Sequence, residues 1–575
     1  MSEKEHPAAT PPEDVQGDPP EQIRPARRGF LTGIAALGAS ATALGALGGC
    51  SSDDNDDDKP APPPAPPTPP DTTRLLRDKV KTLVVIYAEN RSFNNLFANF
   101  PGVEKPLSAL TAADYTQYDR DGTALPALPP VWGGMVPQSQ QANHITYQVD
   151  QAAPYMNNLA NAPFALRGPQ GEPLPQGVVT RDLWHVFYQN QMQINGGKND
   201  RFVAWADSGG LVMGYYSDSA YNLRLWKLAQ EFTLCDNFFQ GAFGGSFLNH
   251  QYLVAAQPPV YPDAANSVAK VQIAQLQSAD PTDTRLQPKP TSPASALTGS
   301  PQFGPSALSP DGFGVNTMGP PYWPAFSRSA ADPTLADPAN PMTMVPQGHA
   351  NIGDLMTAKG LDWAWYAGGW QAAVDSTANT GFPASPNFQA HHQPFNYFKS
   401  TAPGTPARTA HLRDGGLGDI TATNKFLADV EAGKLPPLTF YKPQGNLNMH
   451  AGYADVESGD RHIAHIVDSL RNSPQWKNMV VVITVDENGG WWDHVAPPKG
   501  DRWGPGSRVP TLVISPFSKK GAVDHTIYDT GSILRLATRL FDLPVLDGLK
   551  ARDEAMKGRG QQPMGDLTNA LTLGA

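Results

Sequence analysis

The sequence predicts an α/β domain built in layers, with a mainly parallel sheet at its centre. Short apolar runs rich in β-branched residues recur along the chain, and each ends in polar groups, as strands buried on both faces do. Segments with apolar residues at helical spacing lie between these runs. The alternation of the two patterns is typical of strands joined by crossover helices, and the sequence shows no internal repeat.

Five runs carry the strand pattern and two segments carry a clear helical pattern. The expected strands are residues 82–87, 361–366, 438–441, 479–485 and 509–515. One helix is expected around Ile463, Ile466, Val467 and Leu470, and another around Ile533, Leu534, Ala537 and Leu540, starting after Thr530-Gly531-Ser532. In open α/β sheets, functional groups gather at the carboxyl ends of the strands.

Composition limits the function before any motif is considered. The 575 residues could hold several domains or one large catalytic domain with insertions. Lys+Arg 43 against Asp+Glu 54 gives a net charge of −11, which argues against a surface that tracks nucleic acid by neutralising phosphates. Gly 53 and Pro 58 predict long stretches of turn and loop, while 40% hydrophobic residues are enough for one sizeable core.

The first 50 residues predict an export signal. Arg27 and Arg28 precede a weakly apolar Ala/Leu/Gly run that ends at Leu47-Gly48-Gly49-Cys50. The arginine pair resembles a twin-arginine signal, and the end of the run resembles a lipobox whose cysteine, Cys50, is lipidated. A membrane-spanning anchor is the alternative, but the run is too rich in Gly and Ala to insert well. We expect an exported periplasmic or cell-envelope lipoprotein, and Ser51 fits outer-membrane sorting.

The rest of the chain divides into a linker and one large body. Residues 51–73 combine an acidic run with a proline tract that favours polyproline II, and residues 74–575 form the expected catalytic domain. Residues 258–346 are dense in Pro, Ser, Ala and Asp without sustained periodicity, so they are expected to wrap the outside as an insertion or lid, or to form a small subdomain. Cys235 lies among apolar residues and is expected to be a buried small side chain.

Oxygen-bearing side chains follow two of the expected strands. Residues 82–87 lead into Glu89 and Asn90, and residues 479–485 lead into Asp486 and Glu487. If these strands are neighbours, the side chains could surround one divalent cation, because carboxylates packed together without a counter-charge would take up protons instead. The alternative is that they are solvated acids on loops.

Histidines and one serine add to the predicted site. The histidines in polar or glycine-rich surroundings are His185, His250, His391, His392, His450 and His494. Each could instead be a structural histidine. Ser246 follows a glycine-rich turn at the expected start of a helix, where it could cap the helix or act as a nucleophile beside backbone N–H groups that favour an oxyanion. No Gly-x-Ser-x-Gly elbow surrounds it.

Three ordered motifs between about residues 81 and 543 resemble a known family. They are Glu89-Asn90-Arg91-Ser92-Phe93, Asp486-Glu487-Asn488-Gly489-Gly490 with Asp493-His494, and Arg508-Val509-Pro510 with Ile514-Ser515-Pro516. The set resembles the bacterial phosphoesterase family of phospholipases C and respiratory-burst-inhibiting acid phosphatases. This resemblance implies an alkaline-phosphatase-like three-layer α/β sandwich. Asn94-Asn95, the serine form of the Ser246 motif and His391-His392 look closer to the acid phosphatase branch.

The resemblance also implies roles for individual residues. Ser246 would be both nucleophile and metal ligand, and Glu89, Asn90, Asp486 and Glu487 would complete a site for one divalent ion: calcium, magnesium, manganese or zinc. His185, His391, His392 and His450 would line the phosphate pocket, with His450 the expected proton donor to the leaving alcohol. His494 would either act there or hold its motif loop in place.

The expected function is therefore metal-dependent hydrolysis of phosphate monoesters through a phosphoserine intermediate. The first alternative is a phospholipase C that acts on phosphatidylcholine-like lipids. An inactive envelope binding protein that uses the proline-rich insertion is an alternative of another class. The expected partners are small phosphate esters or phospholipids, no nucleic acid, and a membrane reached only through the N-terminal lipid anchor.

Overall fold

The computed structural model describes residues 72–148, 156–376, 388–417 and 424–574. The predicted signal over residues 1–50, with Cys50, and nearly all of the predicted linker over residues 51–73 lie outside the described residues, so they remain predictions. Within the described ranges, the helices are too short or too polar for any of them to cross a membrane.

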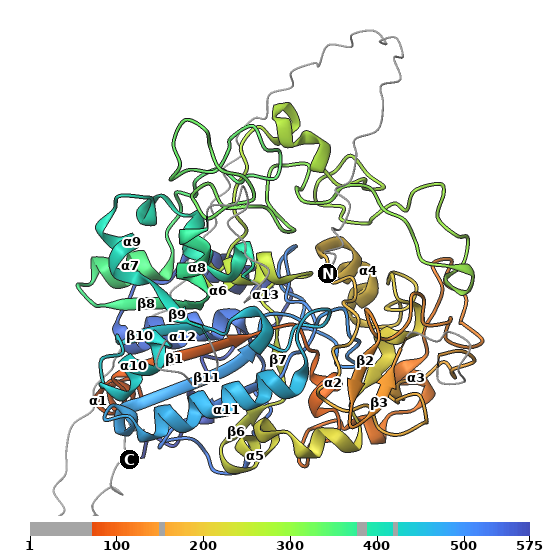
Figure 1. Ribbon diagram of the computed structural model, residues 1–575, viewed down its shortest axis with the longest axis horizontal. Coiled ribbons are helices and arrows are strands. Elements are labelled where there is room, and N and C mark those ends of the chain that lie inside the picture. Colours follow the sequence, from red (N-terminus) through yellow and green to blue (C-terminus); the bar gives the residue numbers. More distant parts are fainter. Residues whose placement is uncertain (1–71, 149–155, 377–387, 418–423, 575) are drawn as a thin grey trace, which may run out of the picture. The chain divides into compact units, whose positions relative to one another are not determined.

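An eight-stranded mixed sheet forms the centre of the described chain (Figure 1). Its strands, in spatial order, are β13 (Ala522–Asp524), β6 (Thr233–Cys235), β12 (Thr511–Ile514), β11 (Met479–Val485), β1 (Thr82–Ala88), β10 (Leu438–Lys442), β8 (Trp363–Gly368) and β9 (Leu412–Gly416). β12 runs antiparallel to both of its neighbours, and the other pairs are parallel. The predicted α/β class with a mainly parallel sheet is confirmed.

The register at the centre of the sheet sets the position of the site. β1 pairs in parallel with β11 along its full length, so that Ala88 lies opposite Val485. Both strands are buried at every position, as their uninterrupted β-branched and apolar sequences require. Both strands therefore end at the same edge of the sheet. Glu89 is the first residue after β1, and Asp486 is the first residue after β11.

Helices pack on both faces of the sheet. One layer contains α5 (Arg224–Glu231), α10 (Lys425–Glu431) and α11 (Val456–Asn472), and the other contains α1 (Thr72–Lys79), α6 (Ser246–Ala255), α7 (Ile352–Ala358) and α12 (Thr530–Phe541). Figure 1 shows α10 and α11 in front of the strands and α12 behind them. The apolar positions predicted from helical spacing, including Ile463 and Ile533, are buried in this arrangement.

The five predicted strands and both predicted helices are present, with one correction at a helix start. α12 begins at Thr530 and not after Ser532, because Asp529 caps it in a reciprocal box with Ser532. Three strands of the sheet were not predicted: β6, β9 and β13. β6 and β13 are three residues long and β9 is mostly polar, so none of them carries a strand pattern. Cys235 on β6 is buried, as predicted.

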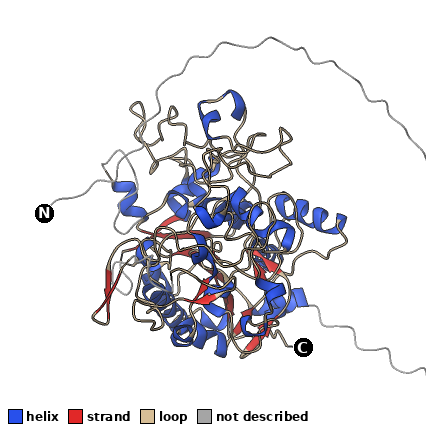
Figure 2. Cartoon of the chain, turned by 90° about the vertical axis from the view of Figure 1, so that its right-hand side faces the viewer, coloured by secondary structure: helices blue, strands red, loops and turns tan. Residues whose placement is uncertain are grey.

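The segment over residues 258–346 is almost entirely irregular chain. It holds short 3₁₀ turns, among them η6 (Val268–Gln272), and isolated bridges such as Ile273 with Leu308. It lies at the top in Figures 1 and 2, away from the strands, and Figure 2 shows it mainly as loop. A small buried group of Trp323, Ala325 and Ala336 packs within it. Six of its residues line the pocket described below.

Candidate active site

The ends of β1 and β11 bring the predicted acidic residues together. The backbone N–H of Asn90 donates to Asp486 Oδ1 at 3.0 Å, which ties the two strand ends to each other. The hydroxyl of Ser246 donates to Glu89 Oε2 at 3.3 Å, although 157 residues separate the two in sequence. The structure therefore places the predicted nucleophile beside the predicted metal ligands.

A tight turn after Glu487 holds the second strand end against the first. Gly489 has φ +61°, and a side chain on it would place its Cβ 2.2 Å from the carbonyl oxygen of Asn90. Only glycine fits such a position without displacing the backbone. The N–H of Gly489 also donates to Glu487 Oε2 at 2.6 Å, which fixes that carboxylate. The glycines of this motif are thus required by the close approach of two backbones.

Ser246 is the first residue of α6, and Gly245 is its N-cap. The side chain of Ser246 makes no capping hydrogen bond, so the alternative role as a helix cap is wrong. A Cβ on Gly245 would lie 2.5 Å from the carbonyl oxygen of His185, so the glycine lets this turn pack against the His185 segment. One turn along α6, His250 Nδ1 lies 2.8 Å from the carbonyl oxygen of Ser246 and 3.7 Å from Asp486 Oδ2.

Glu89, Asp486 and Glu487 are fully buried, so the alternative that they are solvated loop acids is wrong. Burial raises the pKa of Asp486 to about 7, with a further increase from the charge of Glu89. Burial also raises the pKa of Glu487 well above its usual range. At Glu89, Lys442 and His392 outweigh the effect of burial and hold the pKa well below its usual value. The protein alone does not supply enough positive charge for all three carboxylates.

The oxygens that lack donors indicate where a cation fits. Asp486 Oδ2 and Glu487 Oε1 are buried and accept no hydrogen bond within the described chain. Orphaned carboxylate oxygens of this kind are costly unless a cation coordinates them. The donor set of carboxylates, a hydroxyl and an amide therefore fits one divalent ion. Asn90 differs from the other predicted ligands, because its Oδ1 already accepts the N–H of Ala451 at 3.1 Å.

Sequence reasoning missed Lys442, the buried cation of the site. It is the last residue of β10, and its ammonium group contacts Glu89 Oε1. The predicted strand stopped at Tyr441, one residue short of it. Extending the predicted strand by one residue would have made Lys442 a polar residue at a carboxyl end, but only the fold shows that β10 is the direct neighbour of β1.

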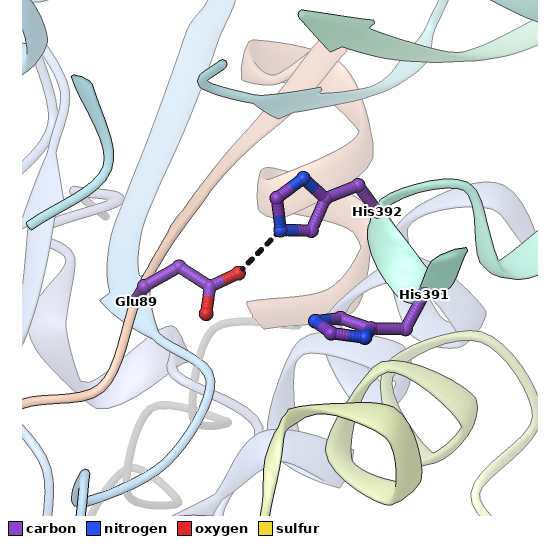
Figure 3. Close-up of side chains that lie close together, drawn as sticks. All are labelled: Glu89, His391 and His392. Atoms are coloured by element: carbon purple, nitrogen blue, oxygen red, sulfur yellow. Dashed lines mark ion pairs between the residues drawn. The ribbon is translucent and has the colours of Figure 1, made fainter. Parts of the chain in front are cut away.

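Two adjacent histidines, His391 and His392, lie on one side of the Glu89 carboxylate (Figure 3). His392 Nε2 lies 3.0 Å from Glu89 Oε1, and its Nδ1 accepts the backbone N–H of Gln389 at 3.4 Å, so the neutral ring carries its proton on Nε2. Burial lowers the pKa of His392 to about 4 and that of His391 well below its usual value. Glu89 forms one potential metal-binding group with these histidines and another with His250 and Asp486. In the sequence analysis, His250 was named as a candidate but was given no role.

A pocket with a volume of about 560 Å³ opens over Ser246. His185, His391 and His450 line it together with a wall from the insertion, formed by Gln272, Ser306, Ala307, Asn316, Thr317 and Met342. The rings of His185 and His450 lie 5.6 Å apart. Asp182, which the sequence analysis missed, lines the same pocket and lies 3.5 Å from His185 Nδ1.

The two facing histidines differ in electrostatic environment. Burial lowers the pKa of His450, although Asp182 and Glu89 oppose that effect. Burial acts in the same direction at His185, but there the charges of Glu487 and Asp182 prevail and raise the pKa to about 9. At neutral pH the pocket therefore holds one protonated and one neutral histidine, a pair suited to stabilising charge and moving a proton.

His494 lies apart from this group. Its ring nitrogens are 3.0 Å from Asn94 Oδ1 and 2.9 Å from the carbonyl oxygen of Lys105, and it does not line the pocket. Its neighbour Asp493 accepts two hydrogen bonds from Arg508, at 3.0 and 3.3 Å, with both side chains buried. Of the two roles considered for His494, the contacts support the one in which the Asp-His pair holds the motif loop.

Replacing Arg508 with methionine is expected to lower the free energy of unfolding by about 3–5 kcal/mol, because it leaves the Asp493 carboxylate buried without its cation. Urea denaturation measures this change. Arg471→Met is the control, since Arg471 pairs with Glu231 at the surface and is expected to cost less than about 1 kcal/mol. Equal losses in the two variants would contradict a structural role for the Arg508–Asp493 pair.

Comparisons with known proteins agree with the motifs. The model of the Phosphoesterase family matches residues 80–544. A protein of Mycobacterium tuberculosis named Phospholipase C B is 24% identical over a 531-residue alignment that covers 86% of this chain and 78% of that protein. Non-specific phospholipase C6 of Arabidopsis thaliana is 33% identical over 151 residues, which cover 21% of this chain and only 29% of that protein. These names do not single out the acid phosphatase branch.

A solved structure from Vibrio parahaemolyticus, described as a protein in the alkaline phosphatase superfamily, matches 64% of this chain and 67% of that chain with 10% identity and a TM-score of 0.29. A score this low carries no argument about function, and the α/β class rests on the sheet itself. The family match extends from the start of β1 past the end of α12, and it includes every motif at the site. This chain belongs to the Phosphoesterase family.

Proposed function

We propose that this chain hydrolyses phosphate esters by attack of the Ser246 hydroxyl on phosphorus. The observation that carries the proposal is the position of that hydroxyl, which lines a pocket, lies 3.3 Å from Glu89 and is close to two buried carboxylates, Asp486 and Glu487, that each keep an oxygen without a hydrogen-bond donor. A divalent ion bound by Glu89, Asp486, Glu487 and Ser246 would lower the pKa of the hydroxyl and offset charge on the phosphoryl oxygens.

The residues of the chain provide the remaining steps. The Ser246 oxygen forms a bond to phosphorus, and the bond from phosphorus to the substrate alcohol breaks in line with it. His185, the histidine of the pocket that is protonated at neutral pH, gives the departing oxygen its proton in place of the expected donor His450, which is neutral there. A water molecule then hydrolyses the phosphoserine. The N-terminus of α6 directs backbone N–H groups toward the same place, where they favour an anionic phosphoryl group.

The favoured substrates are phospholipid headgroup diesters. The relatives that cover most of this chain are named phospholipases C, which supports the alternative from the sequence analysis more than its main reading. The residues that line the pocket include Asp182 but no lysine or arginine. Such a lining disfavours a second anionic group beyond the reacting phosphate. Phosphate monoesters are the second candidate, because Ser246 and Asn94-Asn95 resemble the acid phosphatase branch.

Parallel assays on phosphatidylcholine in mixed micelles and on p-nitrophenyl phosphate separate the two candidates. A phospholipase C is expected to release phosphocholine from the lipid with a kcat/KM well above that for the monoester. The reverse order would establish the monoesterase. Turnover of neither substrate, with divalent ions supplied, would favour the inactive binding protein, although the complete set of Ser246, Glu89, Asp486 and Glu487 argues against it.

His185→Gln is expected to reduce kcat by about a hundredfold for an alkyl phosphate and by less than about tenfold for p-nitrophenyl phosphate, because only a poor leaving group needs its proton early. Steady-state kinetics on the two substrates measures the difference. His494→Gln is the control, and it is expected to change both rates by less than about threefold because His494 lies outside the pocket. Equal losses on both substrates in His185→Gln would exclude His185 as the proton donor.

A further inference from the structure

Large apolar side chains are exposed beside the pocket. The 3₁₀ turn η6 in the insertion carries Val268 and Val271, which are 57% and 55% exposed. Gln272, the last residue of the same turn, lines the pocket. Two exposed valines three residues apart on one short turn form a small apolar patch.

A third apolar side chain, Trp184, is exposed next to other residues that line the pocket. Trp184 is 37% exposed and stands between two residues that line the pocket, Asp182 and His185. Its ring lies 5.4 Å from that of Phe303 in the insertion. Trp184, Val268 and Val271 therefore flank the pocket, and we call them the apolar rim.

We propose that the apolar rim docks the protein on the surface of a phospholipid membrane, with the pocket facing the headgroups. The inference rests on the proposed function of the pocket for its substrate, a lipid phosphodiester. A cavity of about 560 Å³ has the size of a small-molecule site and cannot also enclose two acyl chains. The chains stay outside, in contact with the residues at the opening, where apolar side chains and an interfacial tryptophan are favourable.

Charge decides which lipid surface suits the rim. The chain has a net charge of −11, and Asp182 lies at the pocket with a half-exposed side chain. Both features oppose attraction to an anionic surface. Within η6, Lys270 is the one positively charged residue that acts in the other direction. Apolar contact with a zwitterionic surface must then supply the binding energy, so binding is expected to depend weakly on salt.

Co-sedimentation with phosphatidylcholine vesicles tests the proposal directly. The full chain carries Cys50→Ser, which prevents acylation, and Ser246→Ala, which prevents turnover of the lipid. Adding Val268→Ser and Val271→Ser is expected to weaken vesicle binding by about tenfold. Ile527→Ser with Val545→Ser is the matched control, since these residues are 47% and 40% exposed and do not line the pocket; it is expected to leave binding unchanged.

The two valine substitutions in an otherwise active chain give a second readout. They are expected to lower kcat/KM about tenfold on vesicles and to leave it unchanged on a short-chain soluble phosphodiester, which also shows that the variant is folded. The proposal would be overturned if the double valine variant bound vesicles as tightly as the parent chain. It would also be overturned if the parent did not bind vesicles, or if it sedimented in the absence of lipid. Because sedimentation uses an inactive chain, failure of the proposed catalytic function leaves its result interpretable.

Discussion

Ser246→Ala is expected to lower kcat on every phosphate ester by at least about a thousandfold, because it removes the atom that bonds to phosphorus. The substitution is not expected to unfold the protein. The hydroxyl of Ser246 donates to Glu89, and the loss of this hydrogen bond should cost no more than about 1.5 kcal/mol of the free energy of unfolding. Steady-state kinetics and thermal unfolding of the purified variant measure the two effects.

Ser515→Ala provides the control for this experiment. Ser515 is also buried and donates one hydrogen bond, but to the carbonyl oxygen of Met479 at the start of β11, the end of the strand remote from the site. It should show a similar loss of stability with unchanged turnover. Quenched wild-type reactions should also give a phosphorylated peptide that contains Ser246. A Ser246→Ala variant that keeps a tenth of the wild-type rate would exclude this serine as the nucleophile.

The centre of the fold could be predicted because its strands are buried on both faces. β1 and β11 are apolar without interruption, so their sequences exclude most other structures, and polar residues stand out where they end. The edge strands carry no such signal. β9 has the sequence Leu-Arg-Asp-Gly-Gly, and only its pairing with β8 makes it a strand.

The site was predictable to the extent that its residues follow strong local patterns. Glu89, Asp486 and Ser246 each come directly after a recognisable strand or turn, and the structure brings them together. Lys442 and Asp182 were missed because their importance depends on which strand neighbours β1 and on which loop closes the pocket. Pairing of this kind is a property of the tertiary fold and is not encoded in local spacing.

His494 shows the opposite error, in which sequence proximity suggests a shared site. It follows Glu487 by only seven residues, but the turn through Gly489 and Gly490, both with positive φ, redirects the chain. The His494 ring then packs against Asn94 and Lys105. The insertion illustrates a related limit, because its irregular chain lacks periodicity and yet forms one wall of the pocket.

Asp486→Asn is expected to weaken binding of a divalent ion by at least about a hundredfold and to remove activity with it. Asp486 Oδ1 accepts the N–H groups of Asn90 and Glu487, whereas Oδ2 is buried without a donor. Asparagine can keep the first set of contacts, but it replaces the orphaned oxygen with an amide group that repels a cation. Isothermal titration of chelator-treated protein with calcium, magnesium, manganese and zinc in turn measures the affinity.

Thermal unfolding gives a readout of the same site that is independent of turnover. A ligand at a hundred times its Kd stabilises the native state by about 2.7 kcal/mol, so the wild-type Tm should rise when the ion is added and the Asp486→Asn Tm should not. Asp524→Asn, a change at the buried carboxylate of the last residue of β13, should keep the metal-induced rise. The metal site would be contradicted if chelator-treated wild-type protein kept full activity, or if Asp486→Asn bound the ion as tightly as the wild type. In either case protons rather than a metal would have to stabilise the three buried carboxylates. Ser246 would then need another means of activation.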